Sequence, residues 1–293
     1  MTRYRFIFQE KASLSVTRLC ELLEVSTSAY YDWLARPEPP QPPEDDARLR
    51  LHLRVLHKQS RGTYGRPRLT AALRAQGFVV NHKRVARLMH EEGLVGCPQR
   101  RFKKTTQTDA DATFADNLLE RQFSPQAPDQ VWAGDITYIE VTGGFVYLAV
   151  LIDLFSRRVV GFCVDNHVRT ELVEETLMRA ASVRSVSPGW MHHSDRGCQY
   201  TSHRYQARLR SMDAVVSMSR KGNCWDNAPV ESFFGTIKQE LLHQQTWRGL
   251  REVRAVVSDY IHNFYNPVRI HAHNHYVIPV QAELDFNQQL RVA

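Results

Sequence analysis

Three acidic residues, each in a different predicted element, are candidates to hold a divalent cation together. Asp135 lies within a strand-like segment, Asp195 ends a later strand, and Glu231 stands in the first turn of a helix. A carboxylate inside a strand is costly unless its charge has a partner. Strand ends and a helix start can meet at one edge of a sheet, where three carboxylates suit Mg²⁺ or Mn²⁺. Two such ions can activate a water or a 3′-hydroxyl for attack on a phosphodiester.

The residue types alone do not single out this trio among the 31 acidic residues of the chain. Asp153, Asp165 and Asp226 are rivals. A buried acid also serves commonly as a salt-bridge partner, so a structural role for each of these carboxylates competes with a catalytic one.

The segment that must position the trio changes from helical to strand-like periodicity at Val131. VWAGDITYIEV and FVYLAVLIDL are predicted strands joined by a turn at Thr142-Gly143-Gly144, and RRVVGFCV is a third. The pattern then predicts a helix over 170–183, a strand over 189–195, a turn at Arg196-Gly197, a helix over 203–212, a strand over 214–219 and a helix over 228–242. This order describes an α/β fold, a mixed five-stranded sheet with helices on its faces.

Two short helical modules precede the sheet. In the first, Ser15 is a predicted N-cap and the turn at 24–26 separates two short helices, which indicates either a helix-turn-helix or an ordinary helical hairpin. In the second, Pro67 and Gly77 bound one predicted helix, and Asn81 caps another.

Positive charge is concentrated on the second module. Residues 48–104 hold fifteen Lys and Arg against two acids, although the whole chain carries only +7. Lys83, Arg84 and Arg87 fall on the outer face of a predicted helix near its start, as in a helix that reads DNA. A merely solvated basic face is the alternative.

The composition shifts predict where the parts of the chain begin and end. They are a helix-turn-helix-like segment over 1–36, a Pro-rich linker over 37–47, a basic helix-turn-helix-like DNA-binding module over 48–98, a basic flexible tether over 99–125, a catalytic core with a C-terminal helical extension over 126–285, and a tail over 286–293.

Membrane and secreted classes are disfavoured. The longest apolar run, residues 145–152, has eight residues and cannot cross a bilayer, and the N-terminus shows no signal-peptide pattern. The five cysteines form no CxxC pair and are expected to be reduced thiols. We therefore expect a cytoplasmic, nucleoid-associated protein with no membrane partner.

Five sequence blocks carry a resemblance to a known family. They are YGRPRL at Tyr64, WAGDITYI at Trp132, HSDRGCQYTS at His193, SMSRKGNCWDNAPVESFFGTIKQEL at Ser217 and YNPVR at Tyr265. In addition, 35 residues separate Asp195 from Glu231. The chain resembles the DDE-class transposases of insertion-sequence family three (the OrfB protein), which have a retroviral-integrase-like catalytic core and for which this interval is typical.

The resemblance implies an RNase H-like core in which Asp135, Asp195 and Glu231 are catalytic and hold two Mg²⁺ or Mn²⁺ ions. It implies cleavage at the terminal inverted repeats of a transposon, followed by transfer of the 3′-hydroxyl to target DNA. It also implies a homo-oligomer on DNA and an upstream frameshift partner protein. Together with the basic positions, it gives the expected DNA contacts Arg66, Lys83, Arg84, Arg87, Arg220, Lys221 and Lys238.

Some positions leave alternatives open. Trp225 is either a core anchor or a base-stacking residue, and Asn223, Asp226 and Asn227 are expected to organise the loop before Glu231. Gly134 stands where the family usually carries a larger residue. The alternating histidines His271, His273 and His275 indicate a polar loop rather than a metal site. A DNA-binding regulator, an inactive remnant, or a nuclease without strand transfer are the rival functions.

Overall fold

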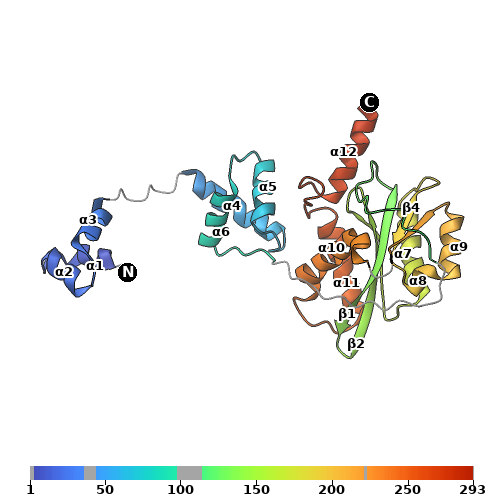
Figure 1. The fold of residues 1–293 in the computed structure, drawn as a ribbon, viewed down its shortest axis with the longest axis horizontal. Helices are drawn as coiled ribbons and strands as arrows, with labels where there is room; N and C mark the ends of the chain where they lie inside the picture. The colour runs from blue at the N-terminus through green and yellow to red at the C-terminus, as the bar shows by residue number, and fades with distance from the viewer. Residues whose placement is uncertain (1–2, 36–43, 98–113, 221–222, 293) are drawn as a thin grey trace. The chain divides into compact units, whose positions relative to one another are not determined.

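The computed structural model describes residues 3–35, 44–97, 114–220 and 223–292 (Figure 1). The chain divides into two compact units, Met1–His52 and Leu53–Ala293. Each unit has its own architecture.

The N-terminal unit contains three short helices, α1 (Arg3–Glu10), α2 (Val16–Leu22) and α3 (Thr27–Ala35), and the first half of the helix that begins at Glu44. The side chain of Ser15 accepts a hydrogen bond from the backbone N–H of Arg18, which confirms the predicted N-cap. Ile7, Leu19, Cys20 and Tyr30 form its small buried cluster. The sequence pattern indicated α2 and α3 but not α1, whose exposed Phe6 and Phe8 blur its apolar face.

A second set of helices forms the basic module: α4 (Glu44–Gln59), α5 (Arg66–Ala75) and α6 (His82–Glu91). Pro67 lies in the first turn of α5, where its missing N–H costs no helical hydrogen bond. Asn81 caps α6 through a hydrogen bond from the Arg84 N–H at 2.9 Å. The buried side chains of the module include Leu53, Leu69, Leu73, Val85 and Leu88.

The linker prediction differs from the structure at its C-terminal end. The linker was expected over 37–47, yet α4 already begins at Glu44. Residues 44–47 (EDDA) follow the last proline, so nothing prevents a helix there, and acids are favourable in a first turn. Residues 36–43 lie outside the described part of the chain.

The core is a five-stranded sheet in the order β3-β2-β1-β4-β5. Its strands are β1 (Val131–Val141), β2 (Gly144–Asp153), β3 (Val159–Asp165), β4 (Met191–Ser194) and β5 (Val215–Met218). The first three strands are antiparallel neighbours, whereas β1, β4 and β5 run parallel. The predicted mixed sheet is therefore confirmed, and this is an α/β, RNase H-like fold.

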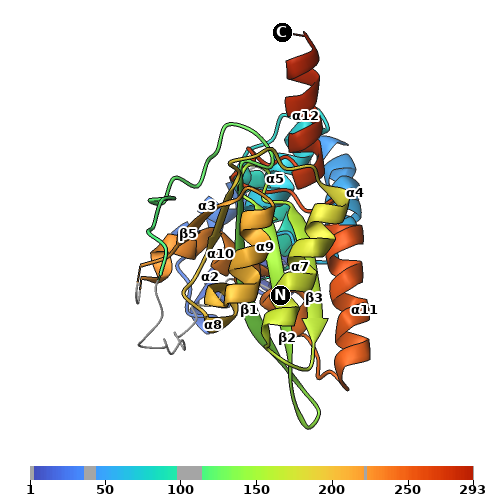
Figure 2. The ribbon, with the colours of Figure 1, turned by 90° about the vertical axis from the view of Figure 1, so that its right-hand side faces the viewer.

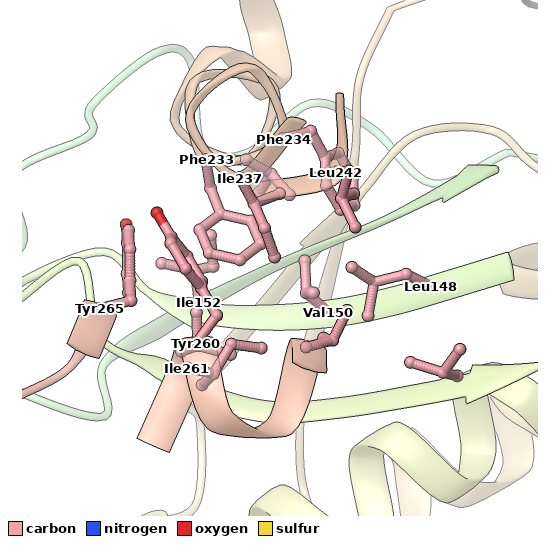
Figure 3. Packing of buried hydrophobic residues seen from close by; sticks show 14 of the residues in the cluster. Leu148, Val150, Ile152, Phe233, Phe234, Ile237, Leu242, Tyr260, Ile261 and Tyr265 are labelled. Carbon is pink, nitrogen blue, oxygen red and sulfur yellow. The ribbon is translucent and has the colours of Figure 1, made fainter. Parts of the chain in front are cut away.

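Helices cover both faces of the sheet, with α10 and α11 on one side and α7, α8 and α9 on the other (Figures 1 and 2). They are α7 (Thr170–Val183), α8 (Cys198–Thr201), α9 (His203–Ser211), α10 (Ala228–Ile237) and α11 (Leu250–Tyr260). Leu148, Val150 and Ile152 of β2 pack under Phe233 and Ile237 of α10 (Figure 3). Trp132, Ala149 and Leu151 face the opposite helices, as strand alternation requires.

Two short π-helical segments, Lys238–Leu242 and Ile261–Tyr265, prolong α10 and α11. A last helix, α12 (Pro279–Val292), follows. The predicted tail over 286–293 therefore differs from the structure, because α12 continues to Val292. Glu283 on α12 is buried and pairs with Arg158 and Arg184, which ties the helix to the core.

The predicted flexible tether over 99–125 also differs from the structure in its second half. Residues 98–113 lie outside the described part, but Asp116 and Leu119 are hydrogen-bonded to β5 at the edge of the sheet. The N–H of Met218 donates to the carbonyl of Asp116 at 3.1 Å, and the N–H of Leu119 donates to Ser217 Oγ at 3.1 Å. Leu119 is buried in the core cluster, so apolar anchors outweigh the polar composition of the segment.

The basic module contacts the core through the first and last of the sequence blocks. The hydroxyl of Tyr64 donates to the carbonyl of Val268 at 2.9 Å and accepts from the N–H of Ile270 at 2.8 Å. Arg68 Nε donates to the carbonyl of Ile270 at 3.3 Å. Tyr64 is buried, so YGRPRL supplies contacts within the protein as well as basic side chains.

Among the described residues, no helix is long and apolar enough to cross a membrane. Cys20, Cys97, Cys163 and Cys198 are free thiols.

Candidate active site

Asp135 and Asp195 lie side by side at the point where two parallel strands separate. Gly134 of β1 pairs with Ser194 of β4, and this is the last pair of the ladder. Asp135 and Asp195 are the next residue on each strand, so the strand register itself places the two carboxylates together. Their backbones fix them further, because the Ile136 N–H donates to Asp135 Oδ1 at 2.7 Å and the Gly197 N–H donates to Asp195 Oδ1 at 3.0 Å.

Burial and mutual repulsion disfavour the charged forms of this pair. The pKa of Asp135 is held well above its usual range by desolvation first, and then by the charge of Asp195. The Ile136 N–H opposes this effect. Burial likewise raises the pKa of Asp195, against the hydrogen bond from Gly197. Two carboxylates that repel each other at a half-buried strand end favour a cation between them.

Glu231 stands in the first turn of α10, behind Pro229. Its charge contributes to the raised pKa of Asp135, so it lies within electrostatic reach of the pair, and its side chain is exposed. Within the described residues, no three His, Cys, Asp or Glu side chains are close enough together to hold a metal ion. The structure thus brings Asp135 and Asp195 together and places Glu231 nearby, without closing a three-ligand cage.

Lys238 follows Glu231 by seven residues and begins the π-helical segment that prolongs α10. Burial lowers the pKa of Lys238, and the negative charge of Asp135 acts in the opposite direction. Its Nζ lies 5.3 Å from the centroid of the Tyr138 ring. The Lys238 ammonium group therefore lies within electrostatic reach of Asp135.

A buried carboxylate organises the loop before Glu231. Asp226 is fully buried and accepts hydrogen bonds from the Arg220 N–H at 3.0 Å, from Arg220 Nε and Nη2, and from Arg121 Nε at 2.9 Å. These donors lower the pKa of Asp226 below its usual range. The expected role of Asp226 as a loop organiser agrees with this geometry. Arg220 is also an expected phosphate contact, but its Nε and Nη2 donors are already bonded to Asp226.

Asn227 and Asn223 also organise the loop before Glu231. Asn227 Nδ2 donates to the carbonyl of Gly134 at 3.2 Å, and Asn223 Oδ1 accepts from the N–H of Trp225 at 3.3 Å. Trp225 itself is 68% exposed, which contradicts the core-anchor alternative. Lys221 lies outside the described residues.

Arg121 is a partner of Asp226 that the sequence did not predict. It is 105 residues away from Asp226, in a stretch whose composition indicated a flexible segment. The signal in the sequence was the apolar spacing of Phe114, Leu119 and Phe123, which indicates a segment anchored to a core.

Two neutral histidines support the strand that carries Asp195. Burial lowers the pKa of His192 to about 3 and that of His193 to about 4. The hydroxyl of Tyr205 is hydrogen-bonded to His192 Nε2 at 2.9 Å. His193 lies between Ser217 Oγ at 2.9 Å and Ser219 Oγ at 3.2 Å, so it bridges β4 to β5.

The rival acids have structural partners. Asp153 accepts from the N–H groups of Asp129 and Ser156 in a buried turn, and Asp226 holds the loop described above. Asp165 accepts from the adjacent Asn166 N–H and lies 3.9 Å from His167. These contacts give Asp153, Asp165 and Asp226 structural roles within turns or as partners of basic side chains.

The expected DNA contacts on the basic module point outward or flank its helices. Arg66 is exposed at the start of α5. Lys83 and Arg87 are exposed on α6, whereas Arg84 is half-buried. Arg87 pairs with Glu91 at 2.9 Å, so the face is basic but not purely so.

Two departures from the family pattern are accommodated locally. At Gly134, a Cβ atom would lie 2.9 Å from Leu151 Cδ2, so Leu151 occupies the space that a larger residue would need. His271 packs edge-on against Tyr265 with ring centroids 4.8 Å apart, and His273 Nδ1 lies 3.1 Å from Arg157. The alternating histidines thus contact different neighbours, in agreement with a polar loop.

Comparison with known proteins places this geometry in a family. The integrase core domain family matches residues 125–224, a second integrase core domain family matches 231–284, and an HTH-like domain matches 43–102. The chain is 36% identical over 282 residues to the transposase InsF for insertion sequence IS3A of Escherichia coli, covering 92% of this chain and 94% of that protein. The chain belongs to the IS3 family of insertion-sequence transposases.

Other relatives of this transposase agree. It is 38% identical over 254 residues to a 31 kDa protein of insertion element IS600 from Shigella sonnei, covering 87% of this chain and 93% of that protein. It is also 38% identical over 231 residues to the transposase of IS904 from Lactococcus lactis, covering 79% and 91%. Solved structures similar to it include a simian T-cell lymphotropic virus intasome (TM-score 0.47, 15% identity, 79% and 74% coverage). Another is the HTLV-2 integrase catalytic core in complex with magnesium (TM-score 0.41, 17% identity, 54% and 98% coverage).

Proposed function

We propose that this transposase cleaves the ends of its insertion sequence and joins the freed 3′-hydroxyl to target DNA, with Asp135, Asp195 and Glu231 as the catalytic DDE residues. The observation that carries the proposal is the strand register, which sets Asp135 and Asp195 side by side with raised pKa values. Two acids that repel each other at a strand end are a poor structural arrangement. They are a good ligand pair for a hard cation.

The donor set fits two Mg²⁺ or Mn²⁺ ions. Carboxylate oxygens are the ligands these cations take, and a site with open positions leaves room for DNA. Asp135 and Asp195 would hold the ions together with Glu231, which is exposed at the start of α10. When bound, such ions lower the pKa of an attacking water or hydroxyl and stabilise the leaving oxygen.

The protein's own groups orient the phosphodiester. Lys238 presents a positive charge beside Asp135, where it would contact a phosphate next to the scissile one. Asn227 holds the start of α10 to β1 through the Gly134 carbonyl, and thereby fixes Glu231 relative to Asp135. Lys238 and Asn227 would thus position the phosphodiester and Glu231 for in-line attack. The cations, when bound, would stabilise the negative charge that develops on the oxygens.

DNA recognition falls to the basic module. Arg66, Lys83, Arg84 and Arg87 would contact phosphates of the terminal inverted repeats, and Lys221 and Arg220 would contact DNA near the cut. We further propose that copies of the chain assemble on the two transposon ends, and that an upstream frameshift partner supplies additional end binding.

The deciding experiment is a metal-dependent nicking and strand-transfer assay. Labelled DNA from the flanks of the gene is incubated with the chain, alone and fused to the upstream reading frame, with Mg²⁺ or Mn²⁺. We expect 3′-end joining that is abolished in Glu231→Gln and in Asp195→Asn, while DNA binding persists. Cleavage by Glu231→Gln would overturn the metal assignment. DNA binding without cleavage in any form would favour a DNA-binding regulator or an inactive remnant.

A further inference from the structure

One large aromatic side chain near the candidate active site faces solvent. Trp225 is 68% exposed, whereas Trp132, Trp190 and Trp247 are at most 3% exposed. Trp33 belongs to the N-terminal unit and is half-buried. Tryptophan is the side chain that gains most from burial, so an indole held in water indicates a surface that binds something.

Hydrogen bonds on both sides hold this indole outward. Before it, the side chain of Asn223 accepts from the Trp225 N–H. After it, Asp226 accepts four hydrogen bonds, and Asn227 donates to the Gly134 carbonyl. The exposure of Trp225 is therefore a property of an anchored turn, because the residues that follow it are buried and paired.

Two arginines meet at Asp226, the residue that follows Trp225 in the chain. Arg121 and Arg220 both donate to the Asp226 carboxylate, and the negative charge of Glu120 also acts on Arg220. The two arginine side chains are 45% and 55% exposed, so N–H donors are left facing solvent. An exposed aromatic face beside guanidinium groups is the combination that binds single-stranded nucleic acid.

We propose that Trp225 stacks on an unpaired DNA base next to the cut, and that Arg121 and Arg220 contact the phosphate of that nucleotide. The proposal rests on the proposed function for its DNA substrate. Trp225 lies six residues before Glu231 in the turn that leads into α10, so a base stacked on it belongs to a nucleotide close to the carboxylates. A paired base offers no free face inside a duplex, so the ligand is a frayed or unpaired end.

The test measures binding separately from catalysis. The full chain carrying Glu231→Gln is titrated with three duplexes made from the end of the element. One is fully paired, one has an unpaired terminal thymidine, and one has an abasic site at that position. The fluorescence of Trp225 is obtained by subtracting the signal of the same protein carrying Trp225→Phe.

We expect quenching with the unpaired thymidine and none with the abasic duplex. Stacking of one base is worth about 1–3 kcal/mol, so the abasic duplex should bind about 5- to 150-fold more weakly. Trp225→Tyr should retain most of this difference because it keeps an aromatic face. Trp225→Leu should remove it, although leucine is also apolar. Tyr276→Leu, which changes another exposed aromatic residue, should have no effect.

Equal quenching by all three duplexes, or equal binding of the unpaired and abasic duplexes, would overturn the proposal. So would Trp225→Leu binding the unpaired end as tightly as Trp225→Tyr does. These results are independent of the proposed function, which is judged by whether the chain with an intact Glu231 cleaves DNA. Cleavage without base-dependent quenching rejects only the stacking site, and quenching without cleavage rejects only the proposed activity.

Discussion

The side-chain amide of Asn227 donates to the carbonyl oxygen of Gly134 at 3.2 Å, and this hydrogen bond links the start of the helix that carries Glu231 to the strand that carries Asp135. Both residues are buried, and Asn227 Oδ1 has no hydrogen-bond partner among the described residues. The bond lies one residue from Asp135 and four residues from Glu231. It is therefore placed to control the separation of the two carboxylates.

Replacing Asn227 should impair catalysis more than DNA binding. Asn227→Ala removes the donor, and Asn227→Asp puts an oxygen where the donor was and adds negative charge near Asp135. We expect kcat for strand cleavage to fall by about 100-fold, as for a displacement of about 1 Å in a catalytic group, with KM for DNA nearly unchanged. Asn263→Ala, which removes an exposed amide bonded to Asp259, is the matched control. Unimpaired cleavage by Asn227→Asp would show that the bond does not position Glu231.

His192 should make the core less stable as the solution becomes acidic, because it is buried in its neutral form. Its pKa is about 3 in the folded chain against 6.5 for the ordinary side chain, so the unfolded chain binds the proton more tightly. The contribution is complete above pH 6.5 and is lost as the pH falls toward 3. One such group costs about 1.4 kcal/mol per pH unit, or about 2 kcal/mol between pH 6.5 and 5.

Urea unfolding at pH 7 and at pH 5 checks this expectation. In His192→Gln, whose side-chain oxygen can accept the Tyr205 hydroxyl, the loss of stability between the two pH values should shrink by about 2 kcal/mol. His193, with a pKa of about 4, adds to this dependence, whereas Asp153, whose pKa burial raises to about 6, opposes it. An identical pH dependence in both proteins would contradict a neutral His192.

Tyr64→Phe should weaken the attachment of the basic module to the core. The ring is retained, but the hydroxyl that donates to Val268 and accepts from Ile270 is removed, which leaves two backbone groups without their partner. We expect the free energy of unfolding to fall by about 1–3 kcal/mol. Hydrogen exchange at the Ile270 amide should accelerate accordingly. Tyr138→Phe, at an exposed tyrosine, should leave both measurements unchanged.

The outer face of α6 should set the salt dependence of DNA binding. Changing Lys83, Arg84 and Arg87 together to glutamine should weaken end binding and reduce the slope of log K against log salt by about 0.9 for each phosphate that is no longer neutralised. The same change at Arg210, Arg251 and Arg291, which are exposed elsewhere in the chain, serves as the control. A slope equal to that of the wild type would show that the α6 side chains only face solvent.

Local signals in the sequence predicted most elements of the core. The helix expected over 170–183 is α7 (Thr170–Val183), and the cap expected at Asn81 starts α6, because amphipathic periodicity and capping act between neighbouring residues. The strand alternation around Asp135 was equally local. The meeting of Asp135 with Asp195 follows from topology, since β1 and β4 are parallel neighbours and their ladder ends one residue before both carboxylates.

The features that the sequence did not predict depend on contacts between distant residues. Composition made 114–125 look flexible, yet Leu119 is buried and Arg121 binds Asp226. Likewise, Arg220 looked like a free phosphate contact, because nothing in the sequence shows that Asp226 is buried beside it. The catalytic assignment of Asp135, Asp195 and Glu231 stays a prediction until the carboxylates are tested one by one.

The filled space at Gly134 has a consequence for how such transposases can diverge. Because Leu151 Cδ2 stands 2.9 Å from where a Cβ atom would lie, a side chain beside Asp135 requires the residue across the hairpin to shift or shrink. Gly134→Thr alone should be selected against, whereas Gly134→Thr with Leu151→Val should be tolerated. The two positions are expected to change together over evolutionary time, as a pair linked by volume rather than by charge.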